Sequence, residues 1–191
     1  MKKRLIQAVL VISTCLLSWL GMMIVHETGH VVHAWMSGGR VVQVVLHPLA
    51  ISRTDVDPNP HPLFVVWGGP IWGCLLPLVA VAVASRLRWR AERCLRFFAG
   101  FCLIANGAYL GSGYWIPVGD ARQLISLGTP HWLLLAFGMV TVCGGLILWH
   151  TLGPRFGLGN ERDNSQAKAA LRITVAAVVI VLAEFVLSAR S

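Results

Sequence analysis

Long apolar segments are the feature that most constrains what this chain can fold into. Five of them, at roughly 5–36, 63–85, 95–117, 131–151 and 171–189, are long enough as helices to cross a hydrocarbon core of about 30 Å. Charged residues make up only 13% of the chain, whereas a soluble domain typically has about 25%. We therefore predict an all-α integral membrane protein with about five transmembrane helices. Residues 1–191 are expected to form a single membrane-embedded domain.

Basic residues give the chain a net charge of +8, and their positions indicate what this charge contacts. Most lie in short gaps between apolar segments, which is typical of the positive-inside rule and of contact with anionic lipid head groups. We therefore expect the lipid bilayer as a partner, and no nucleic acid. With five spans, twelve of the 16 Lys and Arg residues fall on the side of the N-terminus and four on the other. This bias predicts a cytoplasmic N-terminus.

Residues 37–62 separate the first two apolar segments and do not have the pattern of a membrane span. Gly38-Gly39 is expected to end the first helix. Residues 40–46 are rich in β-branched side chains and could pair with residues 50–54 as a short β-hairpin. Residues 55–62 contain three prolines, so a turn-rich connection is expected there.

The strongest chemical signal is the pentapeptide His26-Glu27-Thr28-Gly29-His30 near the end of the first apolar segment. Histidines four residues apart on a helix are separated by about 6 Å along the axis and about 40° around it, so both can reach one tetrahedral Zn²⁺. Glu27 could take a proton from a metal-bound water, whose pKa the metal lowers towards about 7. Ionisable residues in an apolar helix are costly and therefore suggest function. The alternative is a structural cluster in which these side chains pair with one another or with backbone.

A catalytic zinc site also needs a third protein ligand and an open position. His33 lies on nearly the same helical face, but about 10 Å along the axis from His26, so we expect it to be interfacial or supporting. Asp120 is the preferred third ligand. It follows the third segment, where Pro117 and Gly119 break the helix, and five crossings would place it on the same side as the histidines. The alternative for Asp120 is an ordinary loop or capping residue.

Three further polar residues leave alternatives open. Asp55 and Asp57 are weaker candidates for the third ligand, because their sequence is also ordinary for a turn. Asn106, in the third segment, could hydrogen-bond the metal-bound water or the developing oxyanion. A hydrogen bond between packed helices is an equally good interpretation of Asn106.

Four motifs carry a resemblance to a known family, and they span about residues 20–130. They are the pentapeptide at 26–30, Gly38-Gly39-Arg40, Gly68-Gly69-Pro70 and Gly119-Asp120. Together they resemble an intramembrane zinc metalloprotease of the site-2 protease type, in particular its small bacterial relatives.

This resemblance implies Zn²⁺ as cofactor, with His26, His30 and Asp120 as ligands and Glu27 as catalytic base. It implies a catalytic core over about residues 1–130, a hairpin that aligns the substrate as an added strand, and a membrane protein or peptide as substrate. A multi-pass location in a bacterial inner membrane follows from it.

Two features depart from the family pattern. Residues 118–121 read Val-Gly-Asp-Ala, where the family usually has Asn-Pro-Asp-Gly or a Leu-Asp-Gly variant. The charge bias places the site on the outer side, whereas the family's site commonly opens towards the cytosol. The alternative functions are a metal-binding membrane protein without proteolysis, such as a transporter or sensor, and a structural membrane partner without metal.

Overall fold

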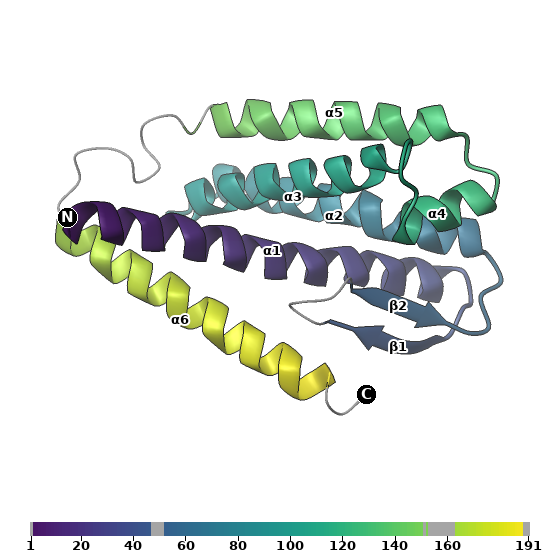
Figure 1. Cartoon of the computed structure of the whole chain (residues 1–191), viewed down its shortest axis with the longest axis horizontal. Helices are drawn as coiled ribbons and strands as arrows, with labels where there is room; N and C mark the ends of the chain where they lie inside the picture. Colours follow the sequence, from purple (N-terminus) through teal and green to yellow (C-terminus); the bar gives the residue numbers. More distant parts are fainter. Residues whose placement is uncertain (1, 47–51, 151, 153–162, 189–191) are drawn as a thin grey trace.

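A computed structural model describes residues 2–46, 52–150, 152 and 163–188 of the chain. Five long helices run along the molecule in alternating directions, and a two-stranded hairpin and a short helix lie towards one end (Figure 1). This confirms the prediction of a mainly helical chain with a short hairpin after the first helix. The elements are α1 (Lys2–Met36), β1 (Val41–Val45), β2 (Arg53–Val56), α2 (Pro62–Arg86), α3 (Glu92–Ser112), α4 (Gly119–Ser126), α5 (His131–His150) and α6 (Asp163–Ser188).

The long helices have the length and composition of membrane spans. Within the described residues, four helices are long and apolar enough to cross a bilayer: Arg4–Met36 of α1, α2, α3 and α5. Helix α6 contains residues 171–188 of the fifth predicted segment. Large apolar side chains such as Ile12 and Val140 are 67% and 73% exposed, which suits a lipid environment and not water. The chain is a membrane protein.

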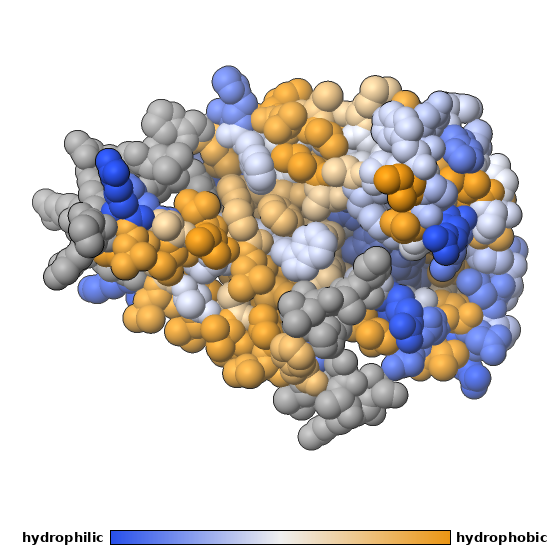
Figure 2. All heavy atoms as spheres, viewed as in Figure 1, coloured by the Kyte–Doolittle hydropathy of each residue, from blue (hydrophilic) through white to orange (hydrophobic). Residues whose placement is uncertain are grey.

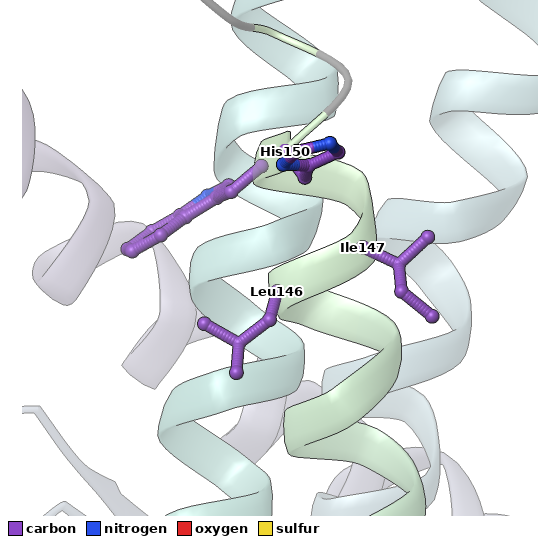
Figure 3. A pocket seen from close by; sticks show the side chains of 4 residues that line it. Leu146, Ile147 and His150 are labelled. Carbon is purple, nitrogen blue, oxygen red and sulfur yellow. The ribbon is translucent and has the colours of Figure 1, made fainter.

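On the face seen in Figure 2, apolar side chains cover much of the middle of the molecule, while hydrophilic side chains gather at the end that holds the hairpin. A hollow of about 550 Å³ on α5 is lined by Leu146, Ile147, Trp149 and His150 (Figure 3). Trp149 is fixed there, because its indole N–H donates to the Phe97 carbonyl at 2.9 Å. This hollow lies on the helix end remote from the histidines of α1 and is lined mainly by apolar side chains.

Glycines bring two pairs of helices into backbone contact. A Cβ atom built on Gly68 of α2 would lie 2.5 Å from the Gly29 carbonyl oxygen of α1, so neither position has room for a side chain. In the same way, a Cβ atom on Gly138 of α5 would lie 2.7 Å from the Gly107 carbonyl oxygen of α3. Small residues at membrane helix interfaces permit such close approach. We call α1 with α2, and α3 with α5, the two glycine-packed pairs.

The end of α1 agrees with the sequence prediction. Gly38 has φ +76°, a left-handed conformation that glycine adopts without the steric penalty of a side chain. The Gly39 N–H then bonds back to the Ala34 carbonyl at 2.8 Å, and the Gly38 N–H bonds to the Trp35 carbonyl at 3.3 Å. This pair of bonds is the Schellman arrangement that terminates helices.

The prediction for the third segment was wrong at its C-terminal end. Helix α3 stops at Ser112, five residues before the expected position 117. Turns follow, in which Trp115 and Ile116 N–H groups both bond to the Ser112 carbonyl. Pro117 then has no N–H to continue a helix. The short helix α4 was not predicted, and it is this helix that carries Asp120.

The hairpin exists, but its second strand is displaced from the prediction. The first strand, Val41–Val45, lies within the expected 40–46, whereas the second covers Arg53–Val56 instead of 50–54. Residues 47–51 lie outside the described part of the chain. Asp55 pairs with Gln43 in the antiparallel ladder, although the sequence around Asp55 predicted a turn. Contacts of β2 with α1 override the local turn preference.

Candidate metal centre

Helix α1 buries His26, Glu27 and His30 between the helices, within the apolar length of the molecule. The two imidazole rings are one turn apart, with centroids 4.9 Å from each other. Each ring uses its Nδ1 atom for a hydrogen bond to another helix. His26 Nδ1 lies 2.6 Å from Asn106 Oδ1 of α3, and His30 Nδ1 lies 2.9 Å from the Val65 carbonyl of α2.

These partners determine which ring nitrogen carries the proton. The Asn106 amide donates its Nδ2 hydrogen to the Cys102 carbonyl at 2.9 Å, so its oxygen faces His26 as an acceptor. The Val65 carbonyl can only accept. His26 Nδ1 is therefore a donor. His30 Nδ1 has two neighbours, and its bond to the Val65 carbonyl at 2.9 Å is shorter than the approach of the Gly69 N–H at 3.3 Å, which favours Nδ1 as donor here too. In each neutral ring of this tautomer the Nε2 atom presents a lone pair.

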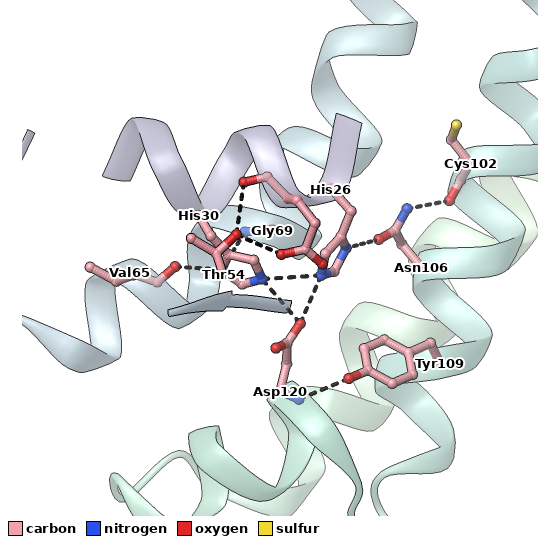
Figure 4. Close-up of polar contacts among 10 residues, drawn as sticks. His26, His30, Thr54, Val65, Gly69, Cys102, Asn106, Tyr109 and Asp120 are labelled. Carbon is pink, nitrogen blue, oxygen red and sulfur yellow. Dashed lines mark hydrogen bonds and ion pairs between the residues drawn. The ribbon is translucent and has the colours of Figure 1, made fainter. Parts of the chain in front are cut away.

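Asp120 reaches the same two Nε2 atoms from α4. Its Oδ2 atom lies 2.8 Å from His26 Nε2 and 3.5 Å from His30 Nε2, and the two Nε2 atoms are 3.2 Å apart. Figure 4 shows the three side chains converging on one point, with Asn106 beyond His26 and Val65 beyond His30. Ligands bonded to a tetrahedral zinc at about 2.0–2.1 Å are separated by about 3.3–3.4 Å. The observed triangle is close to that size.

The donor set fits a metal ion on chemical grounds as well. Two imidazole lone pairs and a carboxylate facing one another repel unless a proton or a metal cation lies between them. Gly69 of α2 leaves space at this position, since a Cβ atom there would lie 2.5 Å from His26 Nε2 and closer still to His30 Nε2. Three protein ligands with a position left open is the pattern of a catalytic zinc site.

Asp120 is held in place through the backbone at the start of α4. Gly119 has φ +49°, and the Asp120 N–H that follows donates to the Tyr109 hydroxyl at 2.8 Å. Burial raises the pKa of the Asp120 carboxyl, but when the two rings carry a proton on Nε2, hydrogen bonds from His26 and His30 and their positive charge outweigh burial and hold the pKa well below its usual range. Asp120 is therefore expected to be ionised at neutral pH, the form in which a carboxylate can bind a metal.

Glu27 is more deeply buried than either histidine of the motif, with 2% of its surface exposed. Its Oε2 atom accepts a hydrogen bond from the Thr54 hydroxyl of β2 at 2.7 Å. One donor atom each from His26, Glu27 and His30 also lies within 4.8 Å of the others, so Glu27 borders the metal position. Asp120 Oδ2 lies 2.8 Å and 3.5 Å from the two Nε2 atoms, which favours Asp120 as ligand and leaves Glu27 for chemistry.

A cavity of about 690 Å³ is lined by two of the three converging side chains, His30 and Asp120, and both the hairpin and α4 contribute to its wall. Its lining is mixed, with polar and charged groups beside valines. The residues that line the cavity include His30, Thr54, Tyr109 and Asp120.

The structure separates the other predicted candidates from the metal position. His33 lies between α1 and α2, where its Nδ1 bonds to the Phe64 carbonyl at 2.6 Å and its ring stacks on Phe64 at 4.0 Å. This agrees with a supporting role. Asp55 is on the cavity wall but pairs with Arg53 at 3.2 Å, and Asp57 lines the same cavity. Neither is brought to the histidine pair as Asp120 is.

Asn106 makes a hydrogen bond between two packed helices, α3 and α1. It is 1% exposed and bonds to His26 and to the Cys102 carbonyl, so it orients a ring that faces the metal position. Sequence reasoning missed Thr54 and Tyr109 as neighbours of the site. No local pattern marks either residue, since both reach the site only through tertiary packing.

Comparison with known proteins now supports the motif evidence. A family model described as Peptidase M50B-like matches residues 4–190. No curated protein and no solved structure matches the chain. The family match covers nearly all of the sequence and includes His26, Glu27, His30 and Asp120. The chain belongs to the Peptidase M50B-like family, the site-2 protease family of membrane metalloproteases that its motifs resemble.

Proposed function

We propose that this protein is an intramembrane zinc endopeptidase, which hydrolyses a peptide bond of a membrane protein or peptide within or beside the bilayer. The observation that carries the proposal is the convergence of His26 Nε2, His30 Nε2 and Asp120 Oδ2 at 2.8–3.5 Å from one another, with Glu27 beside them. Family membership supports the peptidase activity.

His26, His30 and Asp120 would hold the metal, and Asn106 and the Val65 carbonyl would orient the two imidazoles. When bound, zinc supplies a Lewis acid that activates water and polarises a carbonyl. Partners that accept a proton from a ligating histidine also raise its basicity, which strengthens metal binding.

Glu27 is the proposed general base and then general acid. It takes one proton from water as the water oxygen bonds to the carbonyl carbon. It then delivers that proton to the amide nitrogen as the C–N bond breaks, which gives a carboxylic acid and an amine; transfer of the remaining acid proton to the amine leaves a carboxylate and an ammonium group. The Thr54 hydroxyl occupies Glu27 Oε2, so the other carboxylate oxygen can serve the water.

The hairpin and the cavity suit an extended substrate. A peptide segment could add to the hairpin by main-chain hydrogen bonds and lead into the cavity that is lined by Asp120 and by Thr54, the hydrogen-bond partner of Glu27. The site lies in the half of α1 remote from the N-terminus (Figure 1). With the N-terminus in the cytoplasm of a bacterial cell, as the distribution of Lys and Arg predicts, the site would face the outer half of the inner membrane.

Zinc content and cleavage together test the proposal. We expect about one zinc ion per chain in detergent-purified wild type, as the three-ligand geometry requires, and weakened binding in His30→Ala and Asp120→Ala. Glu27→Gln should keep its zinc and lose cleavage of an internally quenched peptide pool.

Folded wild-type protein that binds no zinc would exclude the metalloprotease. Zinc binding that depends on all three ligands, combined with no cleavage that depends on Glu27, would instead favour a non-proteolytic metal-binding membrane protein.

A further inference from the structure

Tyr109 lies beside the proposed active site, and the reaction as described so far does not use it. Its ring meets the His26 ring edge to face, with centroids 6.2 Å apart. Its hydroxyl oxygen accepts the Asp120 N–H at 2.8 Å and would be the first atom that a Cβ on Gly119 met. The hydroxyl is therefore fixed against the backbone that presents the third proposed ligand.

The hydroxyl proton of Tyr109 is the group of interest. A phenol has one proton and two acceptor lone pairs, and the bond from Asp120 uses a lone pair. Within the described residues, no side chain or carbonyl takes the Tyr109 proton in a hydrogen bond. Tyr109 is half-buried and lines the 690 Å³ cavity together with His30, Thr54 and Asp120, so a molecule in that cavity can accept it.

Glu27 and Tyr109 make their hydrogen bonds to different structural elements. The hydroxyl of Thr54, on β2, binds Glu27, while Tyr109, on α3, binds the start of α4. Figure 4 shows Thr54 and Tyr109 on opposite sides of Asp120. A carbonyl approached by water from the side of Glu27 therefore has its oxygen free to turn towards the side of Tyr109.

We propose that Tyr109 is a further catalytic residue, whose hydroxyl donates a hydrogen bond to the oxygen of the attacked carbonyl as negative charge develops there. The inference rests on the proposed function. A neutral donor of this kind transfers no proton, and it contributes because it is already oriented before the charge forms. Loss of one such donor typically lowers kcat by about 10²–10³-fold.

The competing role is purely structural, with Tyr109 serving only to brace Asp120. The two roles predict different properties for Tyr109→Phe. Loss of a brace moves the proposed ligand and weakens zinc binding, so added zinc should restore activity. Loss of an oxyanion donor leaves zinc binding intact and selectively weakens binding of a tetrahedral mimic of the transition state.

The experiment compares wild type, Tyr109→Phe and Tyr114→Phe in detergent. Tyr114 is the chain's other tyrosine, is 40% exposed and lies outside the cavity lining, so it is a matched control for loss of a phenol hydroxyl. The readouts are zinc content, kcat and KM for the best-cleaved member of the quenched peptide pool, and the affinity of a phosphinic analogue of that peptide. For the phosphinic analogue, binding is measured directly by calorimetry.

We expect Tyr109→Phe to keep one zinc and a KM within about twofold of wild type, to lose about 10²-fold in kcat, and to bind the phosphinic analogue more weakly by a similar factor. Unchanged kcat, or a loss that excess zinc restores, would overturn the catalytic role. A wild type that cleaves no member of the pool, or cleavage that persists in Glu27→Gln, would overturn the proposed function itself, and this inference with it.

Discussion

Substitution of Gly69 by alanine gives the sharpest test of how the site is built. The added methyl carbon would lie 2.5 Å from His26 Nε2, about 0.9 Å short of the 3.4 Å at which ordinary contact begins, and nearer still to His30 Nε2. Metal–ligand distances tolerate deviations of only about 0.2 Å, so the imidazoles cannot move aside and still share an ion. The methyl also occupies the space next to both donor atoms.

We therefore expect Gly69→Ala to lower zinc affinity by at least about 100-fold, because even the loss of a partner behind a ligand costs about 10–100-fold. Cleavage should fall at least in proportion, since a displacement of about 1 Å alone can cost about 10²-fold in rate. The fold should survive, because alanine is favoured over glycine inside a helix by about 1 kcal/mol. Chelator competition measures the affinity, and circular dichroism measures the helix content.

Gly144→Ala is the matched control for this experiment. Gly144 also lies inside a membrane helix, α5, but a Cβ there meets only the end of the flexible Leu103 side chain, at 3.3 Å. We expect its zinc affinity to stay within about twofold of wild type, as for substitutions that touch no ligand. The reasoning is refuted if Gly69→Ala binds zinc as tightly as wild type, or if both variants lose zinc equally.

Three other substitutions test the neighbours of the site. Asn106→Leu removes the acceptor of the His26 Nδ1 proton, so zinc affinity should fall by about 10–100-fold, whereas Asn106→Asp keeps an acceptor and should retain most of the affinity in chelator competition. Thr54→Val removes a hydrogen bond to the Glu27 carboxylate that is worth about 1.5–3 kcal/mol, so kcat should fall by roughly tenfold or more while zinc is retained. Thr54→Ser keeps the hydroxyl and should recover most of the lost kcat. Failure of this rescue would exclude the hydroxyl as the cause. His33→Ala should keep full zinc content but melt at lower temperature, because it loses only its bond and stacking to another helix; zinc loss would mean that His33 takes part in the metal site after all.

The parts of this molecule that the sequence predicted well are those set by local pattern. Apolar length identified the spanning helices, and the glycine pair at 38–39 correctly predicted the end of α1. The spacing of His26 and His30 fixes their common face on any straight helix, so their proximity needed no tertiary information. Asp120 was reachable only by combining helix breakers with a count of membrane crossings, and the structure brings it to the histidines.

The remainder depends on contacts between distant segments. The sequence around Asp55 favours a turn, yet it is a strand because β2 packs on α1 and its Thr54 binds Glu27. Helix α4 is only eight residues long, too short for a periodic pattern to be distinctive. Tyr109 lies in an apolar helix like any membrane aromatic residue, and only the fold reveals that its hydroxyl meets the Asp120 backbone.

The proposed metal ligands come from two separate helices. His26 and His30 lie on α1, a member of the first glycine-packed pair, while Asp120 lies on α4, which packs against both α2 and α3. A displacement of α4 relative to α1 would therefore pull the Asp120 carboxylate away from the two imidazoles. Bound zinc would then link α1 to α4, and the free energy needed to separate these helices would rise with the affinity for the metal. Removal of zinc by a chelator should therefore allow α4 to move relative to α1, while the helices themselves stay folded.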